Sequence, residues 1–188
     1  SVDEMAAEFD LHKVHKAGAR FSKEKAEWFN HQYIQKKSDE ELAEILKKSE
    51  VNINLEDEKL LKIIHLMKER LTFVSDLTSD NEKGKFFFEA PTSYDEKASK
   101  KAYNEQTSEI LGELSVKLNE LETFTAENIK KTMQDFAESK NLGMGKVMMP
   151  LRFVLVGELK GPDVPDIVEL IGKEETTARI ENAINYFK

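Results

Sequence analysis

The sequence predicts an all-α protein in which a helical lead-in segment precedes two small helical units. Several stretches begin with a small polar residue that an acidic residue follows one turn later, as at the start of capped helices. Apolar residues then recur along these stretches at helical spacing. Alternating strand and hairpin patterns are absent, as is any repeat of fixed period, which disfavours β and solenoid architectures.

Two helix starts precede residue 70. Ser38 and Glu41 have the spacing of a capping box, which predicts that a helix begins here. Asn54 stands before three successive acidic residues and predicts the start of a second helix. The apolar residues that follow these starts at helical spacing are Leu42, Ile45, Leu46, Leu60, Leu61, Ile64 and Met67.

Two more starts follow in the second half of the chain. Ser93 with Glu96 predicts a long helix that continues to about Leu121, and Thr125 predicts the cap of the next one. The turn cluster NLGMG at 141–145 then ends that helix. The residues expected to point inward from these two helices are Ala98, Ala102, Ile110, Leu114, Leu118, Ile129, Met133 and Phe136.

The last quarter of the chain is punctuated by glycine and proline. Residues 150–156 predict a helix with its proline in the first turn, although the run FVLV would equally suit a short buried strand. Gly157 closes this segment, and residues 161–165 (GPDVP) predict a rigid loop. A short helix is expected over 166–171 and a final helix over 174–187.

A unit boundary is predicted near residue 90. The stretch SDNEKGK at 79–85 is the one convincing non-helical insert, and three phenylalanines and APTS follow it. We therefore expect a lead-in segment over residues 1–37, a first helical unit over 38–90 and a second over 91–188.

Composition limits the possible compartments and chemistries. No cysteine occurs in the 188 residues, which excludes a disulfide framework, a thiolate metal site and a cysteine nucleophile. No stretch approaches the roughly 18 apolar residues of a membrane span, and the acidic opening SVDEMAAEFD is unlike a signal peptide. We therefore expect a soluble, cytoplasmic protein without a membrane partner.

Charge is distributed unevenly along the chain. The formal net charge is −8, yet residues 11–37 hold seven basic and two acidic residues, so this segment carries +5 and the remainder −13. Such a basic segment on an acidic protein suits a polyanionic partner, and it equally suits a solvated helix face.

The familiar motifs of catalysis are missing. The sequence has no GxxxxGK[ST] phosphate loop, no GxGxxG after a strand and no HExxH pair. His12 and His15 could share a helix face, but no third ligand lies nearby, so no metal site is expected. Acidic runs at 39–41, 56–58 and 174–175 fall at predicted helix starts, where the helix dipole accounts for them. No catalytic residue is therefore assigned.

Three stretches carry a more specific pattern. Residues 9–34 read FDLHKVHKAGARFSKEKAEWFNHQYI, residues 66–77 read LMKERLTFVSDL, and residues 144–184 contain PLRFVLVGELKGPDVPDIVELIGKE. In this order they resemble the C-terminal region of bacterial glutamyl-tRNA synthetases, which are class I aminoacyl-tRNA synthetases. Ser22 departs from the aspartate that is usual in that family.

The resemblance implies a stem-contact segment followed by two helical anticodon-binding units. It further implies that the partner is tRNA-Glu and not DNA, and we expect a monomer. The His-Ile-Gly-His and Lys-Met-Ser-Lys-Ser type signatures of the catalytic half are absent from this chain. No cofactor is therefore expected here, since ATP and magnesium belong to the missing catalytic domain, which charges tRNA-Glu with glutamate.

Arg70 falls where the family uses an arginine to read the third anticodon base. There it favours tRNA-Glu over tRNA-Gln, which implies a discriminating enzyme. A guanidinium can donate two parallel hydrogen bonds to the edge of an unstacked base, which a lysine cannot copy. The alternative is a surface arginine paired with Glu69 or Asp76.

A second group of candidates lies near the C-terminus. Arg152 falls where the family contacts the middle anticodon base, and Gly161, Pro162, Val164 and Pro165 fall on the loop that packs splayed bases. Some members carry an aromatic at the place of Pro165, so weaker stacking is expected here. Two prolines and a glycine still offer flat apolar surface, and for Gly161 a rigid link between helices is an equal alternative.

Phosphate contacts are proposed from composition. Lys13, Lys16, Arg20 and Lys25 are candidates for contacts along the inside of the tRNA, and Lys146 is a similar candidate.

The aromatic residues of the lead-in segment are expected elsewhere. Trp28, Phe29 and Tyr33 have the spacing of a buried helix face, so we predict that they lie in the core rather than stack on bases.

Two rival functions remain open at this point. A helical protein–protein adaptor with an acidic surface is favoured if the basic segment proves buried or scattered. A small acidic hydrolase would need carboxylates in a cleft whose ionisable groups have perturbed pKa values. The tRNA-binding interpretation alone explains three motifs in order.

Overall fold

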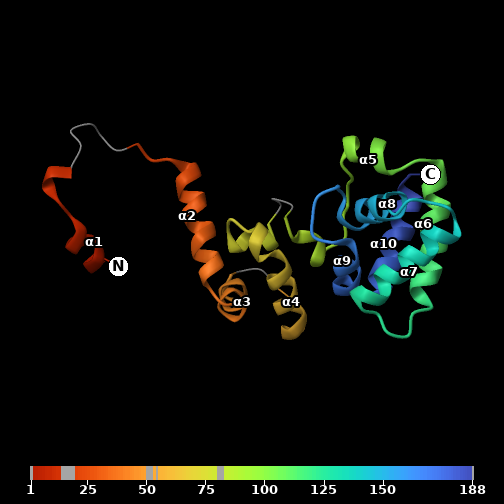
Figure 1. The fold of residues 1–188 in the computed structure, drawn as a ribbon, viewed down its shortest axis with the longest axis horizontal. Helices are drawn as coiled ribbons and strands as arrows, with labels where there is room; N and C mark the ends of the chain where they lie inside the picture. Colours follow the sequence, from red (N-terminus) through yellow and green to blue (C-terminus); the bar gives the residue numbers. More distant parts are fainter. Residues whose placement is uncertain (1, 14–19, 50–52, 54, 80–82, 188) are drawn as a thin grey trace.

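The computed structural model describes residues 2–13, 20–49, 53, 55–79 and 83–187. These residues form ten α-helices and four short 3₁₀ helices and no strand, which confirms the predicted all-α class. The molecule is elongated: the N-terminal helices lie at one end and a bundle of C-terminal helices lies at the other (Figure 1).

The N-terminal end consists of largely exposed helices. α1 (Val2–Glu8) and η1 (Leu11–Lys13) bury no residue, and α2 (Lys23–Lys36) buries only Ile34. The prediction that Trp28, Phe29 and Tyr33 form part of the core is wrong, because their exposed fractions are 57%, 55% and 65%. The helical spacing was read correctly, but the buried face of α2 is the opposite one.

Helix α3 (Asp39–Lys48) begins at the predicted capping box. The Ser38 hydroxyl accepts a hydrogen bond from the amide of Glu41 at 3.2 Å, and the Glu41 carboxylate accepts one from the amide of Ser38 at 2.8 Å. This reciprocal pair satisfies two amides that the first turn of a helix otherwise leaves free. The Ser38 prediction is therefore confirmed.

Helix α4 (Asp57–Met67) packs against α3 and supplies much of the first core. Leu60, Ile63, Ile64 and Met67 have no exposed surface, and burying one such side chain is worth about 1.5–3 kcal/mol. The cap of α4 is Glu56, which makes no side-chain capping bond, and the predicted start at Asn54 lies outside the described residues.

A buried aspartate organises the turn after α4. η2 (Lys68–Arg70) and η3 (Val74–Leu77) flank a turn in which Asp76 accepts hydrogen bonds from the amides of Thr72 at 2.9 Å and Phe73 at 3.1 Å. Lys83 donates to the same carboxylate at 2.8 Å. Burial raises the pKa of Asp76, but the hydrogen bonds from Lys83 and the two amides outweigh it and lower that pKa.

The predicted long helix from Ser93 is two helices in the structure. α5 (Glu96–Ala102) starts at Asp95, whose carboxylate accepts from the amide of Ala98, and Ser93 makes no cap. Tyr103 is extended, and Asn104 then caps α6 (Glu105–Asn119) by accepting from the amide of Gln106 at 3.0 Å. An asparagine side chain that competes for backbone amides explains the break.

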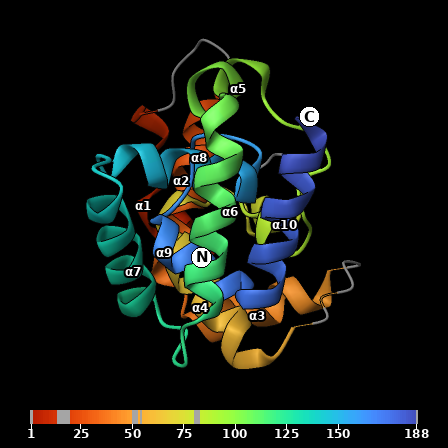
Figure 2. The same cartoon turned by 90° about the vertical axis from the view of Figure 1, so that its right-hand side faces the viewer.

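The C-terminal bundle is formed by α6, α7, α8 (Gly145–Val156), α9 (Val164–Ile171) and α10. α7 (Ala126–Ser139) begins at the predicted Thr125 cap and ends at the turn where Asn141 adopts a left-handed φ of 52°. α10 (Lys173–Tyr186) packs against α6, α8 and α9, and α7 packs against α6, α8 and α9. Figure 2 looks onto this bundle, with α6 in front between α7 and α10.

Helix α8 (Gly145–Val156) starts five residues before the predicted point. The strand alternative is excluded, and Pro150 lies inside the helix rather than in its first turn. Gly157 ends the helix with a φ of 88°, as predicted.

The predicted loop at 161–165 is shorter than expected. Asp163 caps α9 (Val164–Ile171), so Val164 and Pro165 are the first residues of a helix and not part of a loop. A proline is tolerated there because the first amides of a helix have no intrahelical partner.

No helix among the described residues is long and apolar enough to cross a membrane.

Candidate nucleic-acid interface

Arg152 projects from the middle of α8 into a half-buried position. Its Nη1 atom is buried and has no hydrogen-bond partner among the described residues. Burial lowers the pKa of this guanidinium, the carboxylate of Asp163 raises it, and the positive charge of Arg70 lowers it. A buried donor without a partner carries a cost that an acceptor on a ligand would remove.

The structure brings the two predicted anticodon-reading arginines within electrostatic reach of each other. Arg70 is the last residue of η2, directly after α4, whereas Arg152 belongs to α8. Arg70 is exposed and has no ion-pair partner among the described residues. The alternative pairing with Asp76 is not found, since that carboxylate is occupied by Lys83 and backbone amides.

Gly161 lies directly beside the guanidinium of Arg152. Its φ of 138° lies in the region that favours glycine, and a Cβ atom here would lie 3.1 Å from Nη1 of Arg152. The same Cβ would lie 3.8 Å from Ile167 and 3.9 Å from Phe86. Glycine at this position therefore leaves room for the arginine, which neither of the two predicted roles of Gly161 included.

The remaining loop candidates are buried. The side chains of Pro162, Val164 and Pro165 all pack inward, and Val164 has no exposed surface. The expectation that the two prolines offer a flat apolar surface for bases is therefore wrong for this conformation, because the loop turns directly into α9. Their part in RNA binding stays a prediction.

The predicted phosphate contacts are spread over the molecule. Lys13 in η1, Arg20 before α2, Lys25 in α2 and Lys146 at the start of α8 are all exposed. Lys16 lies outside the described residues. The structure thus leaves these charges accessible, three of them at the N-terminal end and Lys146 on the same helix as Arg152.

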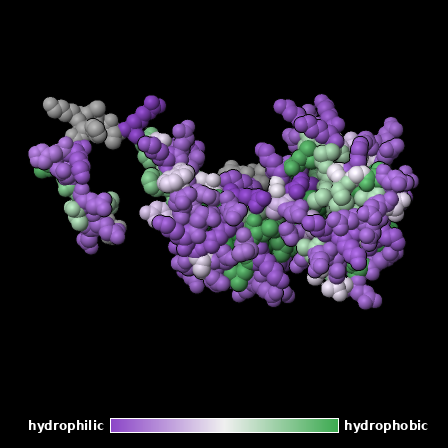
Figure 3. All heavy atoms as spheres, viewed as in Figure 1, coloured by the Kyte–Doolittle hydropathy of each residue, from purple (hydrophilic) through white to green (hydrophobic). Residues whose placement is uncertain are grey.

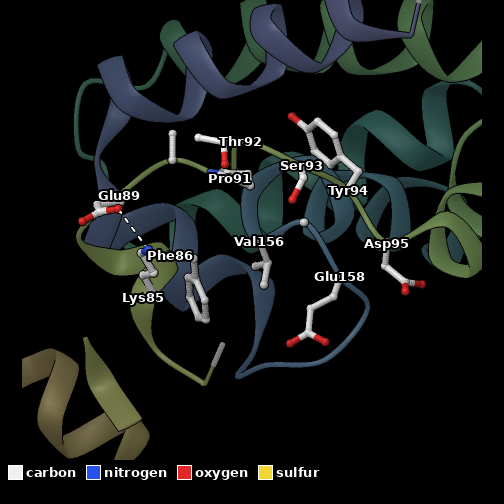
Figure 4. A pocket seen from close by; sticks show the side chains of 12 residues that line it. Lys85, Phe86, Glu89, Pro91, Thr92, Ser93, Tyr94, Asp95, Val156 and Glu158 are labelled. Carbon is white, nitrogen blue, oxygen red and sulfur yellow. Dashed lines mark ion pairs between the residues drawn. The ribbon is translucent and has the colours of Figure 1, made fainter. Parts of the chain in front are cut away.

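A polar cavity of about 410 Å³ lies close to Gly161. Phe86 lines it and also approaches Gly161, and the cavity is bordered by the carboxylates of Glu89, Asp95 and Glu158 (Figure 4). Lys85 pairs with Glu89 at 3.4 Å. This excess of negative charge repels phosphate, so we do not extend the candidate interface into the cavity.

An apolar cleft of about 390 Å³ lies between α4 and α9, where apolar surface is visible in the middle of Figure 3. Asp39 and Asp166 both line it and have opposite pKa shifts. Burial raises the pKa of Asp166, helped by Asp163. Burial raises that of Asp39, but hydrogen bonds from His65 at 2.9 Å and Lys68 at 3.1 Å lower it. These bonds hold α3 against α4, which gives Asp39 a structural role rather than a hydrolytic one.

No group of three or more possible ligands is arranged to hold a metal ion among the described residues. The three acidic runs lie at the starts of α3, α4 and α10, as predicted. His12 is exposed in η1, and His15 lies outside the described residues.

Comparison with family models identifies the fold around this site. A model described as an anticodon binding domain matches residues 39–184, which is well over half of the chain. The chain belongs to the anticodon-binding domain family. The match includes Arg70, Arg152 and the whole of α9, and it begins after α2.

Curated relatives also match the residues that precede the family-model match at residue 39. The chain is 47% identical over 188 residues to a glutamate–tRNA ligase of Flavobacterium psychrophilum, with 98% of this chain and 36% of that protein covered. It is 43% identical to a glutamate–tRNA ligase of Christiangramia forsetii, with 100% of this chain and 37% of the relative covered. The chain therefore spans little more than a third of the relatives that it matches, at their C-terminal end.

Solved structures of the same family agree in fold. A glutamate tRNA ligase from Elizabethkingia meningosepticum is 58% identical with a TM-score of 0.82, and the match covers 100% of this chain and 37% of that one. A glutamate–tRNA synthetase from Elizabethkingia anophelis gives the same identity and TM-score, with 98% and 36% covered.

Two residues that shape this anticodon-binding fold escaped the sequence analysis. Asp163 caps α9 and acts on Arg152, and an acidic residue two places before a proline was an available helix-start signal. Arg179 is buried, and no local pattern distinguishes a buried arginine from a solvated one.

Proposed function

We propose that this chain is the anticodon-recognition part of a glutamate–tRNA ligase and that its partner is tRNA-Glu. The observation that supports this most directly concerns Arg152, whose buried Nη1 has no hydrogen-bond partner in the part of the chain that the structure describes. The same guanidinium is within electrostatic reach of the exposed Arg70. Both arginines lie inside the segment that matches the anticodon-binding family. The proposed amino acid, glutamate, and the proposed partner, tRNA-Glu, follow from the relatives that are named glutamate–tRNA ligases.

The chemistry of the two arginines suits an unpaired RNA loop. Bases splayed from a loop expose acceptor atoms on their edges, and a guanidinium can donate two parallel hydrogen bonds to such an edge. We assign Arg152 to the middle anticodon base and Arg70 to the third, as the family resemblance implies. Two like charges held near each other are disfavoured, and an electron-rich base or a phosphate would relieve that repulsion.

In this proposal the aminoacylation reaction takes place in another part of the polypeptide. A full-length ligase of this family would activate glutamate with ATP and magnesium in its catalytic domain, and this chain would select the tRNA. We infer a cytoplasmic monomer. Gly161 keeps room for Arg152, and exposed lysines such as Lys25 and Lys146 would contact phosphates.

The test is a salt-controlled binding titration of the chain with tRNA-Glu and tRNA-Gln transcripts. Arg70→Gln and Arg152→Ala are compared with the wild type, and Lys131→Ala, which removes an exposed cation on α7, is the matched control. Losing one charge-assisted hydrogen bond of about 1.5–3 kcal/mol should weaken binding by about 10- to 100-fold. We expect that loss for Arg152→Ala and a small change for Lys131→Ala.

The discriminating subtype is read from the ratio of the two affinities. Wild type should prefer tRNA-Glu, and Arg70→Gln should bring the two affinities together. Equal wild-type binding of both transcripts would remove only the subtype assignment. Absence of tRNA binding at low salt, by this chain and by a full-length ligase that contains it, would overturn the proposed function.

A further inference from the structure

Helix α2 attaches to the rest of the molecule through the side that carries its one buried residue, Ile34, and three polar side chains. Asn30 donates to the carbonyl oxygen of Thr72 at 2.5 Å, and His31 donates from Nδ1 to that of Leu71 at 2.6 Å. Gln35 donates to the carbonyl oxygen of Lys68 at 2.8 Å. All three acceptors belong to residues 68–72, the segment that also carries Arg70.

The apolar face of α2 points away from that contact. Trp28, Phe29 and Tyr33 lie on one side of the helix and are each more than half exposed, and Phe21, just before the helix, is 82% exposed. The rings of Trp28 and Phe29 meet edge to face with centroids 5.0 Å apart. A surface helix usually buries its apolar side and exposes its polar side. In α2 the side chains that bond to the protein are mostly polar, and the aromatic rings face solvent.

The preceding segment also exposes apolar residues. In α1 and the residues after it, Val2, Met5, Phe9 and Leu11 have exposed fractions between 66% and 77%. Val2, Met5 and Phe9 follow each other at helical spacing. A run of exposed apolar residues of this kind marks an interaction surface rather than ordinary solvated surface.

We propose that the outer face of α2, formed by Trp28, Phe29 and Tyr33, docks onto the catalytic part of the same ligase polypeptide. The matched relatives continue for nearly two thirds of their length beyond the region that corresponds to this chain. A covalently joined partner has a high effective concentration, so even a modest apolar face is occupied. This proposal rests on the family assignment and not on tRNA recognition.

Protein fits this face better than RNA does. The neighbouring α1 is acidic through Asp3 and Glu4, and Glu8 and Asp10 follow, so α1 repels phosphates, whereas the basic residues of this end of the chain come after it. The edge-to-face pairing of Trp28 with Phe29 is the packing of a protein core, whereas base stacking uses flat, open ring faces.

Docking at this face would also fix the orientation of Arg70, the proposed contact to the third anticodon base. The inner face of α2 is bonded to the carbonyl groups of Lys68, Leu71 and Thr72, which stand on both sides of Arg70. The helix therefore forms one rigid connection between the docking surface and the Arg70 segment.

The first test measures cysteine modification, because the chain has no cysteine of its own. Tyr33→Cys reports on the proposed surface, and Val116→Cys, at a position 58% exposed on α6, is the matched control. Maleimide modification of each is timed in the isolated chain and in a fusion of this chain behind the catalytic part of the Elizabethkingia meningosepticum ligase. Peptide mass spectrometry separates these sites from cysteines of the catalytic part.

We expect the Tyr33→Cys site to react at least about tenfold more slowly in the fusion than in the isolated chain. The Val116→Cys site should react equally in both proteins. Equal rates at both sites in both proteins would overturn the proposal. Protection by added tRNA without protection in the fusion would assign the face to RNA. Protection that rises with the concentration of the isolated chain would assign the face to a second copy of the chain. Either result would overturn the proposal.

A second measurement leaves the aromatic face intact. Trp28 is the single tryptophan of the chain, so 5-fluorotryptophan labelling gives one fluorine resonance from the centre of the surface. That resonance should shift or broaden when the separately produced, folded catalytic part is added, and it should stay unchanged with Phe29→Ser in the chain. The docking surface is ruled out if the resonance does not change at a saturating concentration of the catalytic part and the Tyr33→Cys site is not protected in the fusion. That outcome would leave the tRNA proposal untouched.

Discussion

Arg179 donates from Nη1 to the carbonyl oxygen of Phe86 at 2.7 Å, although the two residues stand 93 positions apart. The same nitrogen donates to the carbonyl oxygen of Leu155 at 2.8 Å, and Nε pairs with Glu175 at 2.7 Å. Burial lowers the pKa of this guanidinium, but the pairing with Glu175 opposes that effect. The final helix is thus joined to the segment before residue 90 and to the turn of α8 that follows Arg152.

Removing the hydrogen bonds of Arg179 should destabilise the chain. Arg179→Met would leave two buried carbonyl oxygens and Glu175 without their donor, at a cost of about 2–4 kcal/mol in the free energy of unfolding. Urea denaturation followed by circular dichroism measures this, with Lys131→Met on the surface of α7 as the control. A loss no larger than that of the control would mean that the buried guanidinium contributes little.

Gly161→Ala should weaken tRNA binding by displacing Arg152. The new Cβ would lie 3.1 Å from Nη1 and the residue would keep an unfavourable positive φ, so we expect about a tenfold loss of affinity. Gly172→Ala has the same kind of backbone strain at φ 93° but no atom within 4 Å of its Cβ. If both variants bind tRNA equally well, the space beside Arg152 is not what Gly161 provides.

Asp76→Asn should make stability less dependent on pH. The pKa of Asp76 is lower in the folded state, so its carboxylate adds stability above the ordinary aspartate pKa of about 3.9. That contribution is lost as the pH falls through the folded pKa. The variant should be less stable by about 1–3 kcal/mol at pH 7 and match wild type at low pH, as urea titrations would show. Asp135→Asn, exposed on α7, should change little at either pH.

Trp28→Ala should have almost no effect on the stability of the isolated chain. Its side chain is more than half exposed, and such substitutions stay within about 0.5 kcal/mol. Leu60→Ala, by contrast, removes a fully buried side chain and should cost about 2–5 kcal/mol. Thermal and urea unfolding compare the two, and a large loss for Trp28→Ala would place this ring in the core after all.

Lys146→Ala should reduce the salt dependence of tRNA binding. If this exposed lysine contacts one phosphate, the slope of log affinity against log salt falls by about 0.7–0.9. Titrations at several salt concentrations give the slope for wild type and variant. An unchanged slope would remove Lys146 from the phosphate contacts.

Local signals predicted much of the helical framework. The caps at Ser38 and Thr125, the glycine stop at Gly157 and the final helix are all found. Each depends on atoms a few residues apart, so the chain carries the information locally. The break at Asn104 was missed because its capping bond competes with an otherwise favourable helical pattern.

The candidate site was predicted as a set of separate residues. Resemblance to the family named Arg70, Arg152 and Gly161, but their mutual arrangement depends on how α9 packs against α4 and α8. The burial of Pro162 and Pro165 was also unforeseen, because a proline-bracketed loop and a helix start have the same local pattern.

By itself, the sequence determined the helical class, several helix ends and the family, because these depend on neighbouring residues and on ordered motifs. Tertiary structure alone decided three things: that Arg179 is buried, that Arg70 and Arg152 act on each other, and that α2 turns its aromatic face outward. The reason is physical. Helical periodicity shows that a helix has two unlike faces, but only the shape and hydrogen-bonding groups of the surface it meets select the face that is buried.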